Sequence, residues 1–224
     1  MQHLERDTLA LRRMAALVLV AALATGLGAT HAAAQAGHPA GEAVRAYQRH
    51  AAAHRGDEAA RWVTRDTHAF YERCRRAALY MDEPALRRRP PMERFTALSL
   101  RITHTAAQLR RMRGRDVLAD LIDRELVRGV DRIVIGDIEP RGDTARVEMR
   151  SERGRHLGPI LVQREADGWR VDLLDVIQRT QAQLGRMASR FGGDDGLDPI
   201  LLALALAHPD RRPTDDIWTP LAPR

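Results

Sequence analysis

Residues 130–175 decide the fold, because they carry four runs with the pattern of β-strands: VDRIVIGDIEP (130–140), RGDTARVEMRSE (141–152), RGRHLGPILVQREADG (153–168) and WRVDLLD (169–175). β-Branched or aliphatic residues recur near every second position in each run. Gly, Pro or Asp stands at each break between runs, as turns require. The pattern predicts consecutive antiparallel strands joined by hairpins.

Short loops fix the expected pairing of these strands. We expect two-residue loops at Arg141-Gly142 in the first hairpin and at Asp167-Gly168 in the last. The cross-strand pairs that follow from these loops are Ile138–Ala145, Asp137–Arg146, Glu165–Arg170 and Gln163–Asp172. One face of the sheet then carries apolar side chains, among them Val162, Val171 and Leu173. The other face is charged, so helices should cover one side only.

Helical periodicity flanks the strands on both sides. Before them, we expect helices near residues 39–54, 57–63, 66–81, 91–102, 106–112 and 116–128, with 82–91 as a linker. After them, an amphipathic helix near 176–191 and an apolar one from Pro199 should follow. The tail from about 209 is too rich in proline for a helix, although Ile217, Trp218 and Leu221 predict that it packs on the surface. The fold class expected is α+β.

Residues 1–36 have the arrangement of a secretory signal peptide. Arg12 and Arg13 precede an apolar run over 14–27, and an A-x-A site follows at 34–36. The run is shorter than the ~20 residues that a membrane span needs. We expect export to the periplasm or the extracellular space, with a mature chain beginning near Gly37; an uncleaved N-terminal anchor is the alternative. Residues 37–224 should then form a single domain that does not span a membrane.

The basic character of the chain does not indicate a nucleic-acid partner. Its net charge is +6, and all 36 basic residues are Arg, with neither Lys nor Asn present. This composition is typical of a GC-rich genome. The 30 acidic residues are interspersed with the arginines, and aromatic residues for base stacking make up only 4%. We therefore expect no nucleic acid among the partners.

Cys74 is the only cysteine, so no disulfide can form within one chain. It lies on a predicted helix whose apolar positions, at spacings of three to four, include Phe70 and Met81. This spacing predicts a buried thiol. The alternative is an exposed thiol that could link two chains.

Three carboxylates on the predicted sheet are candidates for acid–base chemistry: Glu148, Glu165 and Asp172. Arg146 or Arg170 could tune their pKa values if the charged face lined a pocket. Direct pairing with Arg on a solvent-facing surface is the interpretation we prefer. In that case Asp172 stays ionised and chemically idle.

Two further motifs are weak. His50 and His54 are spaced to share a helix face and could bind a metal, but the intervening residues are all Ala and a third ligand is not identifiable, so we expect an exposed pair. Arg141-Gly142-Asp143 matches an adhesion tripeptide, yet Gly and Asp are also what a hairpin turn needs. We expect no bound metal and no cofactor.

The segments GEAVRAYQRHAAAHRGDEAARWV, GDTARVEMR and PILVQREADGWRVDL give the chain a resemblance to the nuclear transport factor 2-like superfamily. Within it, the chain looks similar to exported bacterial proteins of unknown function. The resemblance implies N-terminal helices packed on a curved, cone-like antiparallel sheet of three to four strands, followed by two C-terminal helices. It implies no catalytic residues, because the Asp–His or Tyr–Asp sets of the superfamily's enzymes have no counterpart here.

The expected function is that of an exported binding or scaffolding protein. One alternative is a small-molecule isomerase or hydro-lyase with an acid–base carboxylate in the cone. Another is a carrier of an apolar ligand or lipid, which the apolar helix from Pro199 favours. A small apolar ligand or a protein partner is expected, and a homodimer is kept as an alternative.

Overall fold

The computed structural model describes residues 37–127, 133–191, 198–211 and 214–222. The predicted signal peptide therefore lies outside the described residues. The described chain divides into two compact units. The sheet unit contains the described residues up to Tyr71 together with Arg115–Val176, and the tail unit contains Glu72–Gly114 and the chain from Ile177 onward.

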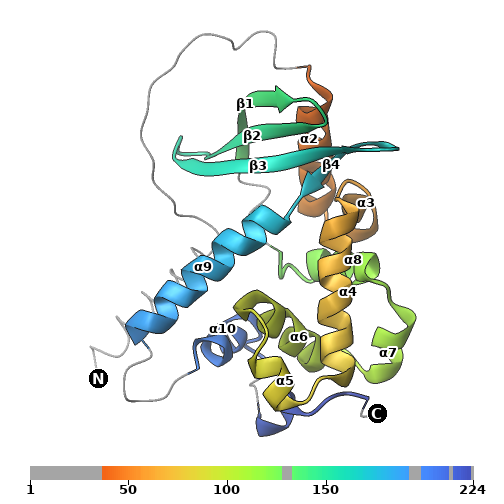
Figure 1. The fold of residues 1–224 in the computed structure, drawn as a ribbon, viewed down its shortest axis with the longest axis vertical. Helices are drawn as coiled ribbons and strands as arrows, with labels where there is room; N and C mark the ends of the chain where they lie inside the picture. Colours follow the sequence, from red (N-terminus) through yellow and green to blue (C-terminus); the bar gives the residue numbers. More distant parts are fainter. Residues whose placement is uncertain (1–36, 128–132, 192–197, 212–213, 223–224) are drawn as a thin grey trace. The chain divides into compact units, whose positions relative to one another are not determined.

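A four-stranded antiparallel sheet forms the centre of the sheet unit (Figure 1). Its strands, in the order of the sequence and of the sheet, are β1 (Ile133–Arg141), β2 (Thr144–Ser151), β3 (His156–Glu165) and β4 (Gly168–Asp172). The predicted alternation of faces is confirmed. The buried face is formed by Ile138, Ala145, Val147, Met149, Ile160, Val162 and Val171.

The predicted register of the two hairpins was wrong by two residues. The first loop is Gly142-Asp143, so Ile138 pairs with Val147. The last loop is Ala166-Asp167, so Gln163 pairs with Arg170 and Asp172 with Leu161. The glycines explain the shift: Gly142 has a φ of 61° at the first loop position, whereas Gly168, with a φ of 120°, already belongs to β4. A shift of two residues leaves each side chain on its predicted face.

Two irregularities interrupt the ladders of the sheet. The register shifts between Ile135 and Ile138 in β1, and again between Met149 and Arg150 where β2 pairs with β3. Such bulges bend a strand and increase its local twist. Gly136 lies in the first of them, and a side chain there would meet Glu148 Cβ at 3.3 Å.

Three helices accompany the sheet: α2 (Pro39–Ala52), α3 (Gly56–Ala60) and α8 (Gly114–Asp123), whose first residue belongs to the tail unit. α2 contacts all four strands and buries Val44, Tyr47 and Ala51. His38 caps the helix by accepting a hydrogen bond from Ala40 N at 3.1 Å. Trp169, which follows the last loop, is half-buried and packs edge-to-face on the ring of His38 at 5.3 Å.

The turn between α2 and α3 packs tightly on α8. Gly56 N donates to Asp123 Oδ1 at 2.7 Å, and a Cβ on Gly56 would lie 2.1 Å from Ala119 O. His54 and Glu125 end their helices with φ values of 51° and 58°, and their side chains approach each other to 3.6 Å. The main chain at Ala119 leaves no room for a side chain at position 56, so glycine is required there.

Helix α4 (Arg65–Tyr80) contributes residues to both units. The tail unit adds α5 (Glu83–Arg87), α6 (Pro91–Thr103), α7 (Ala106–Arg111), α10 (Pro199–Ala207), a short 3-10 helix η2 (Asp215–Trp218) and most of α9 (Leu174–Phe191). The linker expected over 82–91 thus contains a helical turn, because Asp82 Oδ1 accepts from Ala85 N at 2.9 Å and Leu86 is buried. Cys74 is fully buried, as predicted.

The α+β class is confirmed: N-terminal helices pack against a four-stranded antiparallel sheet, and further helices follow it. None of the described helices has the length and apolarity needed to cross a membrane.

Gly56→Ala should destabilise the protein strongly, because the added methyl group overlaps the main chain at Ala119. Overpacking of this kind typically costs about 1–3 kcal/mol, and a rigid main-chain neighbour places the change at the upper end, about 3 kcal/mol. A urea titration measures the free energy of unfolding. Gly37→Ala is the matched control, since a Cβ there meets nothing within 4 Å. Equal stability of the two variants would contradict the packing described.

Candidate functional site

Two of the three carboxylates singled out in the sequence, Glu165 and Asp172, lie at the N-terminus of α4. We call Thr64, Thr67, Gln163, Glu165 and Asp172 the cap cluster; all five residues belong to the sheet unit. The chain just before α4 runs beside β4, where Val63 forms a parallel bridge with Val171. Thr64 N donates to Val171 O at 3.0 Å, and Val171 N donates to Trp62 O at 2.7 Å. This short pairing carries the start of α4 to the end of β4.

Asp172 is buried, with 6% of its surface exposed, so the prediction that it faces solvent was wrong. Its carboxylate accepts hydrogen bonds from Thr67 Oγ1 at 3.3 Å, from Gln163 Nε2 at 3.0 Å and from Leu174 N at 2.8 Å. The last of these bonds satisfies a main-chain N–H at the start of α9. Three donors are what a buried carboxylate needs to offset part of its desolvation.

The two threonines complete the cluster. Thr64 Oγ1 caps α4 by accepting from Thr67 N at 3.3 Å, and the two hydroxyl oxygens are 3.0 Å apart. Thr67 Oγ1 also accepts from Leu173 N at 3.1 Å and donates to Asp172. One chain of hydroxyl groups therefore leads from Thr64 through Thr67 to the carboxylate. Both threonines are buried.

Burial raises the pKa of Asp172 above the ordinary value of an aspartate. Hydrogen bonds from Leu174 and Thr67 oppose this effect, whereas the negative charges of Asp66 and Asp175 add to it. The ionised form is therefore disfavoured in the folded protein. Chemically, this is the direction that suits a general base, although the three bonds of the carboxylate all serve the chain itself.

Glu165 also contacts the N-terminus of α4. It accepts from Arg65 N at 2.9 Å, and its carboxylate lies 3.5 Å from Arg65 Nε. Negative charge at a helix N-terminus is favourable because the helix dipole is positive there. Glu165 pairs with Gly168 in the sheet, not with Arg170 as expected.

Arg170 and Glu148 remain outside the cap cluster. Arg170 donates to Asp167 Oδ2 at 2.6 Å and to Trp169 O at 2.9 Å, and its guanidinium lies 5.7 Å from the ring centre of Trp62. Glu148 lies on β2, where its carboxylate is 3.9 Å from His156 Nδ1. Glu148, Arg170 and Asp172 share one face of the sheet, as predicted, but these contacts do not join the first two to Asp172.

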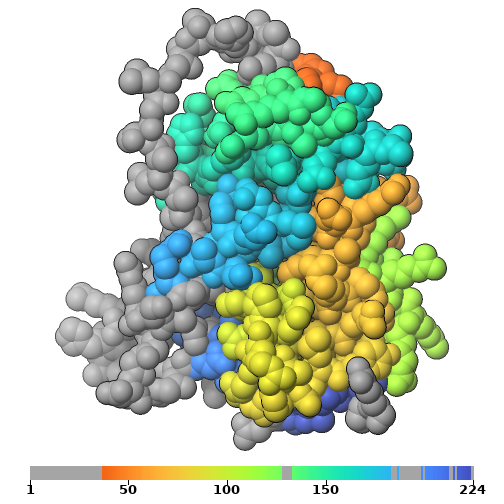
Figure 2. Space-filling model, in the orientation of Figure 1, coloured from red at the N-terminus to blue at the C-terminus, as the bar shows by residue number. Residues whose placement is uncertain are grey.

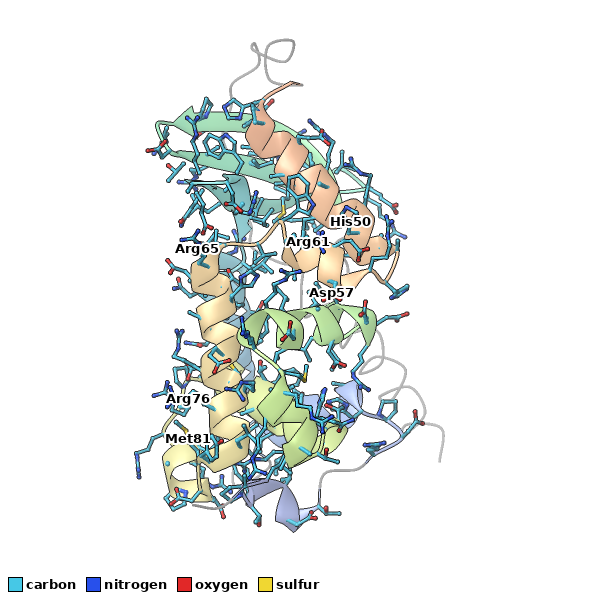
Figure 3. All side chains as sticks on the ribbon, turned by 90° about the vertical axis from the view of Figure 1, so that its right-hand side faces the viewer. His50, Asp57, Arg61, Arg65, Arg76 and Met81 are labelled. Carbon is cyan, nitrogen blue, oxygen red and sulfur yellow. The ribbon has the colours of Figure 1, made fainter. Side chains whose placement is uncertain are left out.

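The two histidines considered as metal ligands differ in position. His50 belongs to α2 (Figure 3), and among the described residues its buried Nδ1 atom has no hydrogen-bond partner. His54 lies beyond the end of that helix and pairs with Glu125. Over the ranges that the structure describes, no three His, Cys, Asp or Glu side chains are grouped to bind a metal ion.

A Ser–His pair that sequence reasoning missed lies in the tail unit. His208 Nε2 is 3.1 Å from Ser99 Oγ, which joins the end of α10 to α6. Ser99 is 1% exposed, so the hydroxyl is closed to a substrate. Burial also raises the pKa of the Cys74 thiol, which makes it a poor nucleophile.

Asp172→Asn should change how stability depends on pH. The folded pKa of Asp172 is raised, so protonation stabilises the fold below the unfolded pKa near 3.9, and this contribution is lost as the pH rises through the folded pKa. The free energy of unfolding of wild type, minus that of Asp172→Asn, should therefore fall from pH 3 toward pH 7. Urea titrations across this range measure the difference.

Asp167→Asn is the matched control for that experiment, with the opposite sign. The hydrogen bond from Arg170 lowers the pKa of Asp167, so its contribution is present at neutral pH and is lost on acidification. A difference for Asp172→Asn that rises with pH, as for Asp167→Asn, would show that the Asp172 carboxylate is not desolvated.

Comparison of the chain with family models, with curated proteins and with solved structures finds no match. The findings therefore support an α+β protein with a four-stranded antiparallel sheet.

Proposed function

We propose that this chain is an exported binding protein whose ligand or partner is apolar. The observation that carries the proposal is the surface of α10, PILLALALA. Ile200 and Leu204 are buried, whereas Leu206 is 38% exposed and Leu201 and Leu202 are half-buried. A soluble helix normally turns polar residues outward, so an all-apolar helix that is only partly buried is typical of a binding surface.

The engagement of the sheet carboxylates supports binding over catalysis. Asp172 and Glu165 hold the N-terminal groups of α4 and α9, and Glu148 lies near His156. A general base must reach a proton of its substrate. A carboxylate that accepts three hydrogen bonds from its own chain would have to exchange one of them to do so.

The cone-like form of the fold is part of the proposal. Two register shifts bend the sheet, and α2 contacts all four of its strands. Both features support the resemblance to the nuclear transport factor 2-like superfamily, in which helices close a curved sheet. Fold alone assigns no activity to this chain.

An isomerase or hydro-lyase is the second candidate, because burial raises the pKa of Asp172. In that case Asp172→Asn would abolish turnover of a small ketone or hydroxy compound while the folded state persists. In a binding protein, the same change alters stability and leaves ligand affinity unchanged. The two measurements on one variant separate the candidates.

Leu206→Gln should weaken binding of a fluorescent fatty acid used as an apolar probe. Replacing a partly exposed leucine by a polar side chain removes roughly 1 kcal/mol of apolar contact, or about a fivefold change in Kd. Val134→Gln is the matched control, since Val134 is 51% exposed on β1 in the sheet unit. Equal affinity of the two variants, or no binding by wild type, would contradict the proposal.

The compartment has its own test. The basic residues, the short apolar run and the A-x-A site support export followed by cleavage before Gly37. Mass analysis of the protein recovered from the periplasm or medium should find a chain that begins close to Gly37. Recovery of intact residues 1–36 on the exported protein would contradict cleavage and favour the N-terminal anchor.

A further inference from the structure

The C-terminal tail, residues 214–222, is held in the tail unit as a peptide is held by a binding protein. It lies against the C-terminal part of α4 together with α5 and α6, a surface that we call the tail groove. In the ribbon and the space-filling view, the dark blue tail lies against the yellow α5 (Figures 1 and 2). Ile217, Trp218 and Ala222 are buried.

The buried guanidinium of Arg101 supplies the main polar contacts in the tail groove. It donates to Ile217 O at 3.0 Å and to Trp218 O at 2.7 Å, both in the tail. It also donates to Ala77 O, Ala78 O and Met81 O at the end of α4. All five acceptors are main-chain carbonyls, and a cation is favourable at a helix C-terminus.

The tail also contributes two main-chain N–H donors and the buried ring of Trp218 to its contacts with the tail groove. Leu221 N donates to Ala78 O at 3.4 Å, and Ala222 N donates to Leu79 O at 2.9 Å. The guanidinium of Arg87 stacks at 4.0 Å from the ring centre of Trp218. Main-chain bonds combined with a buried Trp beside Arg are the pattern of a peptide-recognition hot spot.

The described residues between α10 and the tail are mostly exposed. Pro209, Asp210, Arg211 and Thr214 are exposed, and Arg211 Nη1 donates to Ile102 O at 2.7 Å. The tail contacts named above all lie within the nine residues 214–222.

We propose that the tail groove is a peptide-binding site that accepts residues 214–222 of a second copy of this chain, which gives a dimer with exchanged tails. A second copy is the occupant because its tail is the one ligand whose fit to the groove is described. Reciprocal exchange preserves every contact and closes with twofold symmetry. The covalent connection gives the chain's own tail a high effective concentration, so exchange occurs when the protein is concentrated or when a second copy offers a better-fitting tail than the chain's own.

Complementation of two full-length variants tests the exchange. The Arg101→Met chain has an intact tail and an impaired groove, whereas the Trp218→Ala chain has an intact groove and an impaired tail. Sedimentation velocity should show monomers for each chain alone and a heterodimer for the mixture. The matched control replaces the first chain by the Arg101→Met/Trp218→Ala double variant, which supplies neither part and should give no heterodimer. Absence of a heterodimer between two folded chains would overturn the exchange.

A peptide experiment keeps the inference falsifiable if Arg101→Met prevents folding. A labelled peptide of residues 214–222 is added to the full-length Trp218→Ala chain, and binding is followed by fluorescence anisotropy. The peptide should bind saturably, and a peptide with Trp218→Ala should bind about tenfold more weakly or less well still. Wild type should bind the peptide more weakly than the Trp218→Ala chain, because its own tail competes. No saturable binding, or equal binding to both chains, would overturn the site.

The proposal is independent of the apolar face of α10. Leu206→Gln should leave the heterodimer and the peptide affinity unchanged, so failure of one proposal is distinguishable from failure of the other.

Discussion

One buried carboxylate at the end of β4 bonds to the first turns of two long helices. Asp172 bonds to Thr67 in the first turn of α4 and to Leu174 at the first residue of α9. Unpaired N–H groups at a helix start must find an acceptor, and a buried carboxylate must find donors. At Leu174 one hydrogen bond meets both requirements, whereas in α4 the donor to the carboxylate is the Thr67 hydroxyl. Both helices begin in the sheet unit and continue into the tail unit.

A buried charge of the opposite sign has the corresponding role in the tail unit. Arg101 is 8% exposed and bonds to five carbonyls, three of them at the end of α4. Desolvation lowers the pKa of Arg101 to about 10, which still leaves the guanidinium charged at neutral pH. Helix α4 is thus completed by carboxylates at its start and by an arginine at its end, as its dipole favours. Both charges bond mainly to main-chain or neutral side-chain groups, so neither depends on a buried ion pair.

The sequence predicted what local periodicity controls and missed what depends on distant contacts. The strand faces and most helices follow from alternating or helical spacing of apolar residues. The register did not, because an Asp-Gly pair allows the glycine either within the loop or at the first position of the next strand, where Gly168 lies. The setting of Asp172 could not be read from local pattern at all, since Thr67 is 105 residues away and reaches it through the bridge of Val63 with Val171. Arg101 was hidden among 36 arginines, most of which are surface residues by composition.

The same bonds explain why the polar residues of this chain say little about chemistry. A catalytic group needs a strong interaction that forms only with the substrate or transition state. In the cap cluster and around Arg101, the strong interactions already join one part of the chain to another. The polar groups of the cap cluster and of the tail groove are thus engaged within the chain, whereas Leu206 on α10 leaves apolar surface exposed. Apolar surface binds by excluding water, and our proposal of a binding protein rests on this difference between engaged polar groups and exposed apolar surface.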